Sequence, residues 1–175
     1  MNDKLNFLNR GNRREVYISE GKILKKLIKK SNLNNQEYQI FNSLKNIIDK
    51  KFNENFMNII DLNENYLICE LIKNYDNSIS KNLSEFDLKK LDLNFFEKIK
   101  EIILFLLDNG FYYFDLNSKN ILVREIKKGI FIPVFCDYKT INRKYPFQIN
   151  LLFENQKKKK VIRRLNRILD LNNSS

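Results

Sequence analysis

Histidine is absent from this chain of 175 residues, and cysteine, glycine and proline are scarce. Without histidine the chain cannot form a Ser-His-Asp triad, a Cys-His nucleophile pair or a His-containing zinc site. Its two cysteines, Cys69 and Cys136, cannot build an all-cysteine metal site alone. The four glycines are too dispersed for a G-x-G-x-x-G dinucleotide fingerprint or a G-x-x-x-x-G-K-[ST] phosphate loop. Several common catalytic and binding classes are therefore excluded.

Long apolar segments are also missing. The first ten residues are polar and lack the apolar region of a secretion signal. The longest apolar run, Ile102 to Leu107, is far shorter than the roughly 20 residues that span a bilayer. We therefore expect a soluble cytoplasmic protein. In that reducing compartment both cysteines should be free, and each lies within an apolar segment that would bury it.

The composition is that of a folded protein, with 43% hydrophobic and 30% charged residues. The formal net charge is +11, from 32 Lys and Arg against 21 Asp and Glu. Asparagine, isoleucine and lysine are abundant and alanine is absent, which is typical of an AT-rich genome. Part of the positive charge is therefore compositional background, and motifs of Asn, Lys and Asp recur by chance.

The first half of the chain reads as a small sheet with one helix. Apolar residues at helical spacing predict a helix over 37–48. Short apolar runs on either side, separated by turns rich in Gly, Asn and Asp, predict two hairpins. The predicted order is β-β-α-β-β, with strands at 16–18, 23–28, 59–60 and 66–71.

The second half begins after a polar segment, residues 74–85, which we interpret as a connection between two lobes. A continuous apolar stripe predicts a long helix over 95–107 that ends at Asn109-Gly110. Two strands, 121–123 and 130–136, should flank a Lys-Lys-Gly turn. A last amphipathic helix is predicted around 161–169.

One group of polar residues indicates a catalytic function. A D-x-x-x-x-N loop, Asp115 to Asn120, follows the long helix, and Asp137 ends the last predicted strand. Phosphoryl transfer requires a carboxylate near the attacking hydroxyl, oxygen ligands for Mg²⁺ and cations on the phosphates. The spacing alone recurs by chance in so Asn-rich a chain. Its position between a capped helix and two strands favours a phosphotransfer site over two solvated turns.

The segment 107–123, together with Asp137-Tyr-Lys, resembles the catalytic loop and metal-binding motif of the protein-kinase-like fold. Within that superfamily the chain is similar to the YrbL-like PhoP-regulated proteins, which are small and bacterial, and in outline to bacterial lipopolysaccharide core sugar kinases. The resemblance implies a two-lobed α+β fold. A small β-rich N-lobe would span 1–73, and a minimal, mostly helical C-lobe would span 74–175.

The resemblance also implies roles for individual residues. Asp115 would be the catalytic base or the carboxylate that orients the acceptor hydroxyl. Asn120 and Asp137 would hold Mg²⁺ against the phosphates of ATP. Lys26 would contact the α- and β-phosphates and would be oriented by Glu37, with Lys25 as the alternative lysine because strand alternation lets one of the two face the site.

The resemblance places the remaining nucleotide contacts in the N-terminal half of the chain. Residues 11–17 resemble a degenerate glycine loop that keeps only Gly11. Residues 66–71 resemble the strand that enters the hinge between kinase lobes. Glu70 and Ile72 would offer backbone groups to the adenine edge, and Cys69 would line its pocket.

Several departures from kinases affect the expected activity. Tyr113-Phe114 replaces His-Arg, Asn117 replaces a lysine and Lys139 replaces a glycine. The short segment after Asp137 leaves no room for peptide-binding helices, which favours a small-molecule or glycolipid hydroxyl as acceptor. The alternative is a catalytically inactive scaffold or nucleotide-sensing regulator.

The basic C-terminal segment allows two interpretations. Lys157 to Lys160, Arg163, Arg164 and Arg167 could contact an anionic membrane surface or a phosphorylated sugar or lipid acceptor. Alternatively, the last helix packs its apolar stripe on the C-lobe and leaves its cations in solvent. No groove-reading motif indicates a nucleic-acid partner. We expect a monomer.

Overall fold

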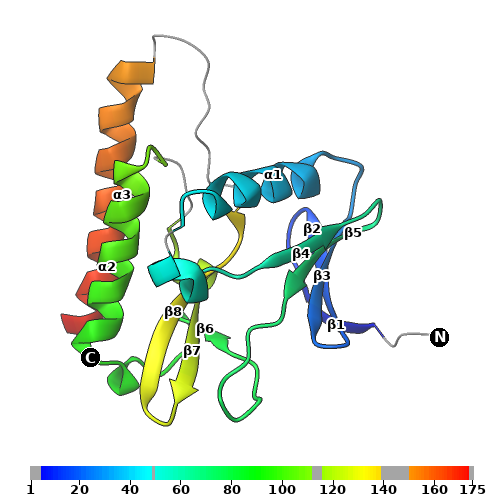
Figure 1. Ribbon diagram of the computed structural model, residues 1–175, viewed down its shortest axis with the longest axis horizontal. Helices are drawn as coiled ribbons and strands as arrows, with labels where there is room; N and C mark the ends of the chain where they lie inside the picture. Colours follow the sequence, from blue (N-terminus) through cyan, green and yellow to red (C-terminus); the bar gives the residue numbers. More distant parts are fainter. Residues whose placement is uncertain (1–4, 49, 112–115, 139–149, 174–175) are drawn as a thin grey trace.

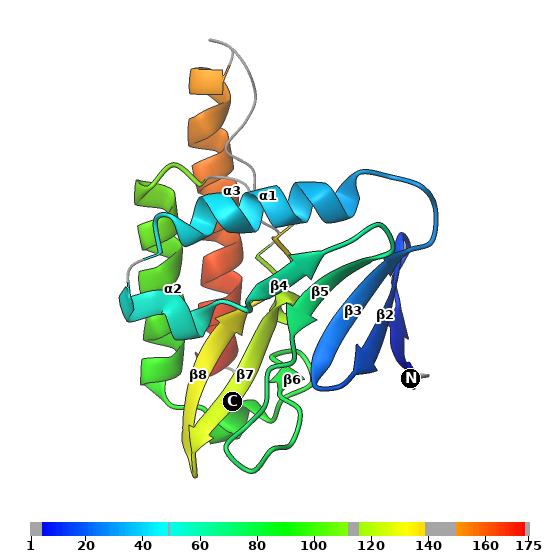
Figure 2. The same cartoon turned by 45° about the vertical axis from the view of Figure 1, so that its right-hand side comes forward.

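The computed structural model describes residues 5–48, 50–111, 116–138 and 150–173, with side chains of the last helix described for 158–171. A five-stranded antiparallel sheet with helix α1 (Leu33–Lys45) across it forms one part of the molecule (Figure 1). A three-stranded sheet with helices α2 (Leu93–Asp108) and α3 (Asn150–Asn173) forms the other. The helices α2 and α3 lie side by side at the left in Figures 1 and 2.

The larger sheet has the strand order β1-β2-β3-β5-β4. The predicted first hairpin is confirmed, because β2 and β3 pair along their whole length. Glu20 and Gly21 connect them with positive φ values of 47° and 74°, the left-handed backbone that tight hairpin turns require. The strands are β1 (Asn6–Arg10), β2 (Arg14–Ser19), β3 (Lys22–Leu27), β4 (Ile59–Leu62) and β5 (Tyr66–Glu70).

Two features of this part differ from the sequence prediction. Strand β1 was not predicted, because all five of its residues are exposed and show no alternation of burial. Helix α1 (Leu33–Lys45) begins and ends earlier than the predicted range 37–48. It covers the sheet with Phe41 and Leu44, both buried, and a 3-10 turn at Lys50–Asn55 leads to β4.

The smaller part contains the predicted long helix and hairpin. Helix α2 (Leu93–Asp108) begins with the Asp92 carboxylate accepting a hydrogen bond from the Phe95 amide at 3.0 Å. Strands β7 (Ile121–Lys127) and β8 (Ile130–Phe135) pair antiparallel. The polar segment 74–85 is more than a connection, because β6 (Lys81–Asn82) pairs with β7 and Leu83 is buried.

Helix α3 (Asn150–Asn173) packs against α2. Its apolar residues Val161, Leu165 and Ile168 are buried in the same core as the apolar stripe of α2. This confirms the interpretation in which the last helix packs on the C-lobe. Within the described ranges, none of the helices is long and apolar enough to cross a membrane.

Candidate phosphotransfer site

A buried ion cluster joins strands β2 and β3 of the larger sheet to helix α1. Glu37 of α1 is fully buried, and its two carboxylate oxygens contact different cations. Lys25 Nζ of β3 lies 2.7 Å from Oε1, and Arg14 Nη1 of β2 pairs with Oε2. Arg14 faces Leu27 and Lys25 faces Val16 in the β2–β3 register, so both cations stand on the sheet face that α1 covers.

Lys25 therefore takes the position that we expected for Lys26. The expectation that Glu37 orients Lys26 is wrong, because successive side chains of a strand point to opposite faces. In the sheet register, Lys26 lies opposite Glu15 of β2 and Tyr66 of β5, and its side chain is exposed. The alternative that the sequence left open, Lys25, contacts Glu37.

The charges in this cluster stabilise one another. Burial by itself would raise the pKa of Glu37, but Lys25 and Arg14 together lower it from 4.5 to about 2. Burial likewise opposes the charged form of Lys25, yet the carboxylate of Glu37 raises the pKa of this lysine well above its ordinary value. The charge of Asp137 acts in the same direction. Glu37 is thus ionised and Lys25 protonated at neutral pH, with Asp137 in electrostatic reach.

Tyr138 connects this cluster to the end of β8. Its backbone N–H donates to Glu37 Oε1 at 3.2 Å. Its hydroxyl donates to the carbonyl oxygens of Met57 at 2.7 Å and Phe135 at 3.0 Å, and its fully buried ring packs against Phe41 with centroids 5.3 Å apart. Glu37 and the aromatic core therefore hold the segment that carries Asp137.

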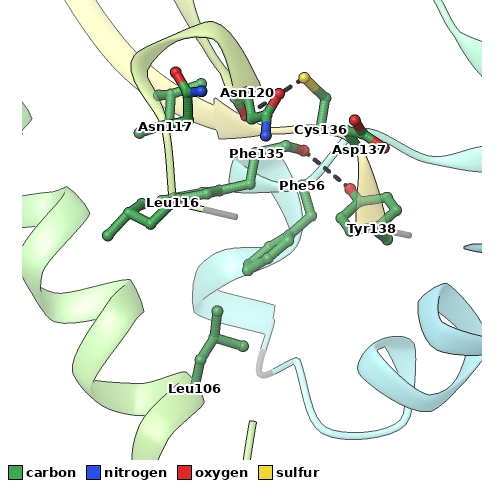
Figure 3. A pocket seen from close by; sticks show the side chains of 10 residues that line it. Phe56, Leu106, Leu116, Asn117, Asn120, Phe135, Cys136, Asp137 and Tyr138 are labelled. Atoms are coloured by element: carbon green, nitrogen blue, oxygen red, sulfur yellow. Dashed lines mark hydrogen bonds between the residues drawn. The ribbon is translucent and has the colours of Figure 1, made fainter. Parts of the chain in front are cut away.

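Asn120 and Asp137 line one small cavity, although Asn120 lies just before β7 and Asp137 lies just after β8. Asn120 immediately precedes β7, and its carbonyl oxygen accepts a hydrogen bond from the Cys136 N–H at 3.0 Å. Asp137 follows with a φ of 65°, a conformation uncommon outside glycine. Figure 3 shows Asn117, Asn120 and Asp137 along one wall of the cavity, opposite Leu106. The fold therefore brings Asn120 and Asp137 to the same cavity.

The donor chemistry of this wall fits Mg²⁺. A carboxylate and an amide are hard oxygen ligands of the kind that Mg²⁺ uses, with water and phosphate oxygens completing its octahedron. The cavity has a volume of about 20 Å³, enough for about one water molecule. Among the residues that the structure describes, His, Cys, Asp and Glu form no group of three that could hold a metal without further ligands.

The residues expected around adenine lie at the end of β5. Cys69 is fully buried beside Leu67 in the sheet, and burial raises the pKa of its thiol to about 11. The Glu70 N–H donates to Asn58 O at 2.9 Å, and the Ile72 carbonyl accepts from the Ser80 N–H at 3.1 Å. These two backbone groups already have hydrogen-bond partners within the fold.

Gly11 lies in the turn between β1 and β2, where its N–H donates to the Arg14 carbonyl at 2.8 Å. A Cβ atom at this position would meet that carbonyl oxygen at 3.7 Å, an ordinary van der Waals distance. The space at this turn therefore does not require a glycine.

The expected catalytic residue, Asp115, lies outside the described residues. The segment that follows it borders an open groove of about 340 Å³ between the loop and helix α3. Asn117 and Ser118 form one side of this groove, and Arg164 and Arg167 form the other. Ile168 and Leu171 add an apolar part to the lining that the structure describes.

Two residues of the site were missed by sequence reasoning. Arg14 belongs to a run of polar residues in which the sequence indicates no ion-pair partner for it. Its partner in the fold, Glu37, is 23 positions away. Tyr138 is 101 positions from Glu37. The only sequence signal for Arg14 is its alternation with Val16 and Ile18, which places it on the buried face of β2.

The comparisons with known proteins concern the fold. No protein-family model matches the chain, and no curated protein matches its sequence. Among solved structures, the chain is similar to the Rio2 kinase–ADP/Mg²⁺–phosphoaspartate complex from Chaetomium thermophilum, with a TM-score of 0.61 and 14% sequence identity. The match covers 93% of this chain and 56% of that one, so this chain spans a little over half of the kinase's length.

This similarity and the topology together define the fold class. The protein has an α+β, protein-kinase-like fold, with an antiparallel sheet and one helix in the N-lobe. The expected fold class is confirmed.

Proposed function

We propose that the protein is a kinase-like phosphotransferase that binds Mg-ATP between its two sheets and transfers the γ-phosphoryl group to a hydroxyl of a small molecule or glycolipid. One observation carries this proposal. The Lys25–Glu37 pair contacts the backbone of Tyr138, next to Asp137, which shares a cavity wall with Asn120. A phosphate-binding lysine and two oxygen ligands for Mg²⁺ thus belong to one connected cluster.

The chemistry follows from these positions. The bond between the γ-phosphorus and the β–γ bridging oxygen breaks, a bond from the acceptor oxygen to phosphorus forms, and ADP leaves. The proton of the acceptor hydroxyl passes to a carboxylate, for which Asp115 is our candidate. Lys25 would offset the negative charge of the phosphates, and Glu37 would hold the Lys25 side chain in place. Mg²⁺ held by Asn120 and Asp137 would neutralise further phosphate charge.

The nucleotide and the metal have support from the fold neighbour, which was crystallised with ADP and Mg²⁺. The acceptor proposal rests on the basic groove beside Asn117 and Ser118. Arg164 and Arg167 would favour an acceptor that carries a phosphate or another anionic group. A phosphorylated sugar or lipid has that chemistry, consistent with the finer resemblance to YrbL-like proteins and lipopolysaccharide core sugar kinases. The division into lobes at residues 73 and 74 belongs to the same proposal.

Turnover of ATP tests the function. The purified protein is incubated with Mg-ATP and sugar or lipid acceptors with and without phosphate groups, and ADP formation is followed. We expect ADP release that depends on Mg²⁺ and rises with an anionic acceptor. Asp137→Asn should abolish it, whereas the exposed Lys26→Met should not. Equal ADP formation by the wild type and the Asp137 variant would refute the proposed enzyme.

A second function, nucleotide sensing without turnover, is favoured by the narrow cavity at Asn120 and Asp137 and by the loop that keeps only Gly11. It predicts saturable nucleotide binding, measured by calorimetry, together with no ADP above a single turnover. Sustained turnover would exclude it.

A further inference from the structure

One hydrogen-bonding edge of the Arg14 guanidinium has no partner among the residues that the structure describes. Arg14 is only 7% exposed, and its Nη1 is committed to Glu37. Its Nε and Nη2 atoms are buried and have no hydrogen-bond partner in the described part of the chain. A buried N–H group without an acceptor is costly, so natural proteins rarely leave one without a reason.

The two unused atoms form one geometric unit. In a guanidinium, the N–H groups of Nε and Nη2 point in parallel from the same edge and match two oxygens of a carboxylate or phosphate. Pairing through Nη1 leaves this two-donor edge intact. Arg14 therefore presents a preformed fork for an oxyanion while it remains anchored on Glu37.

The position of this fork indicates which oxyanion it meets. Arg14 and Lys25 contact the two oxygens of the same carboxylate, so an anion that reaches Lys25 is also close to Arg14. Arg14 also begins β2 directly after the turn at Gly11 to Arg13, where glycine-loop amides would otherwise face phosphate.

The charge balance agrees with an anionic ligand. Two cations share one carboxylate, and the nearby Asp137 offsets the remaining positive charge. Once Asp137 holds Mg²⁺, as we propose above, the cluster again has excess positive charge in a buried place. Phosphate groups would neutralise it.

We propose that Arg14 is a phosphate-binding residue whose Nε and Nη2 groups grip the phosphates of the nucleotide beside Lys25, in place of glycine-loop amides. The ligand class is a pyrophosphate-containing nucleotide, and in this respect the inference rests on the proposed function. Because the fork is buried, an entering phosphate must displace the atoms that cover it.

Binding of pyrophosphate, ADP and adenosine to Arg14→Lys tests the proposal. Lysine retains the positive charge for Glu37 but lacks the fork. Loss of charge-assisted hydrogen bonds predicts roughly 10-fold to 100-fold weaker binding of ADP and pyrophosphate by calorimetry, with adenosine affinity unchanged within about twofold. Arg13→Lys, the same change one residue away at an exposed position, is the matched control and should bind like the wild type.

The outcomes separate this inference from the function. If the wild type and Arg14→Lys bind ADP equally, the fork is refuted and the phosphotransferase proposal stands. If pyrophosphate binds through Arg14 but nucleotides do not bind, the fork stands and the nucleotide function fails. If neither ligand binds the wild type, both proposals fail.

If the Arg14→Lys variant does not fold, the ¹⁵N–¹H resonance of Arg14 Nε in the wild type is measured instead. A shift on adding pyrophosphate supports the fork, and an unmoved resonance at saturation refutes it.

Discussion

Replacing Glu37 by glutamine should destabilise the protein more than any comparable change of a surface carboxylate. The substitution removes the one negative charge that Arg14 and Lys25 share, while keeping the shape of the side chain. The lowering of its pKa from 4.5 to about 2 corresponds to about 3 kcal/mol of stability at neutral pH. Breaking a buried ion pair by removing one partner costs a similar 3–5 kcal/mol, roughly, in other proteins.

The assay is urea denaturation of the wild type and Glu37→Gln between about pH 7 and pH 2, with thermal melts in parallel. A loss of about 3 kcal/mol should lower the melting temperature by roughly 6–12 °C in a protein of this size. Because the pKa of Glu37 is lower in the folded state, its stabilising effect is present above its unfolded pKa and disappears as the pH falls toward about 2. The stability difference between the two proteins should therefore shrink over that range.

Glu15→Gln is the matched control, because Glu15 lies on the opposite face of β2 with a partly exposed side chain. Its pairing with Arg10 at 3.7 Å is worth at most about 1 kcal/mol. A Glu37→Gln variant as stable as the control, or a stability difference that does not change with pH, would refute the buried cluster as the electrostatic centre of the site.

Three further predictions concern other parts of the molecule. Tyr138→Phe removes the hydroxyl that donates to two buried carbonyl groups and should cost about 1–3 kcal/mol in urea denaturation, whereas an unchanged midpoint would contradict the anchoring role. Burial raises the pKa of Cys69 to about 11 and that of Cys136 to about 12. Both thiols should therefore react with a disulfide reagent at pH 8 far more slowly in the folded protein than in the urea-unfolded protein, and equal rates would contradict this. Changing Arg164 and Arg167 together to glutamine should raise the KM for an anionic acceptor at least about 10-fold and leave the affinity for ADP unchanged, and an equal loss for a neutral acceptor would contradict the groove as an anion site.

The fold was predictable where hydrophobic periodicity is strong. Helix α2 has an apolar stripe that is buried along its whole length, and its Gly110 adopts the positive φ of 81° that ends many helices. The β7–β8 hairpin likewise follows from two apolar runs around Gly129. Strand β1 could not be predicted, because an exposed edge strand has no buried face and therefore no alternating pattern.

The site was predictable in outline but not in register. Apolar residues precede Lys25 and follow Lys26 in pairs, so the local pattern does not say which lysine faces the core. The answer depends on pairing with β5, where Leu67 lies opposite Lys25 and Tyr66 opposite Lys26. The involvement of Arg14 depends on a contact between distant segments, which no local pattern encodes.

The contrast between the two adjacent lysines tests the account most directly. Calorimetric titration of Mg-ATP into the wild type, Lys25→Met and Lys26→Met measures whether the Lys25–Glu37 cluster is a nucleotide site. We predict saturable binding by the wild type, affinity within about twofold of it for Lys26→Met, and at least about 10-fold weaker binding for Lys25→Met, since a charge-assisted contact to phosphate is lost. Absence of binding to the wild type at millimolar Mg-ATP, or equal affinities for the two variants, would contradict the account.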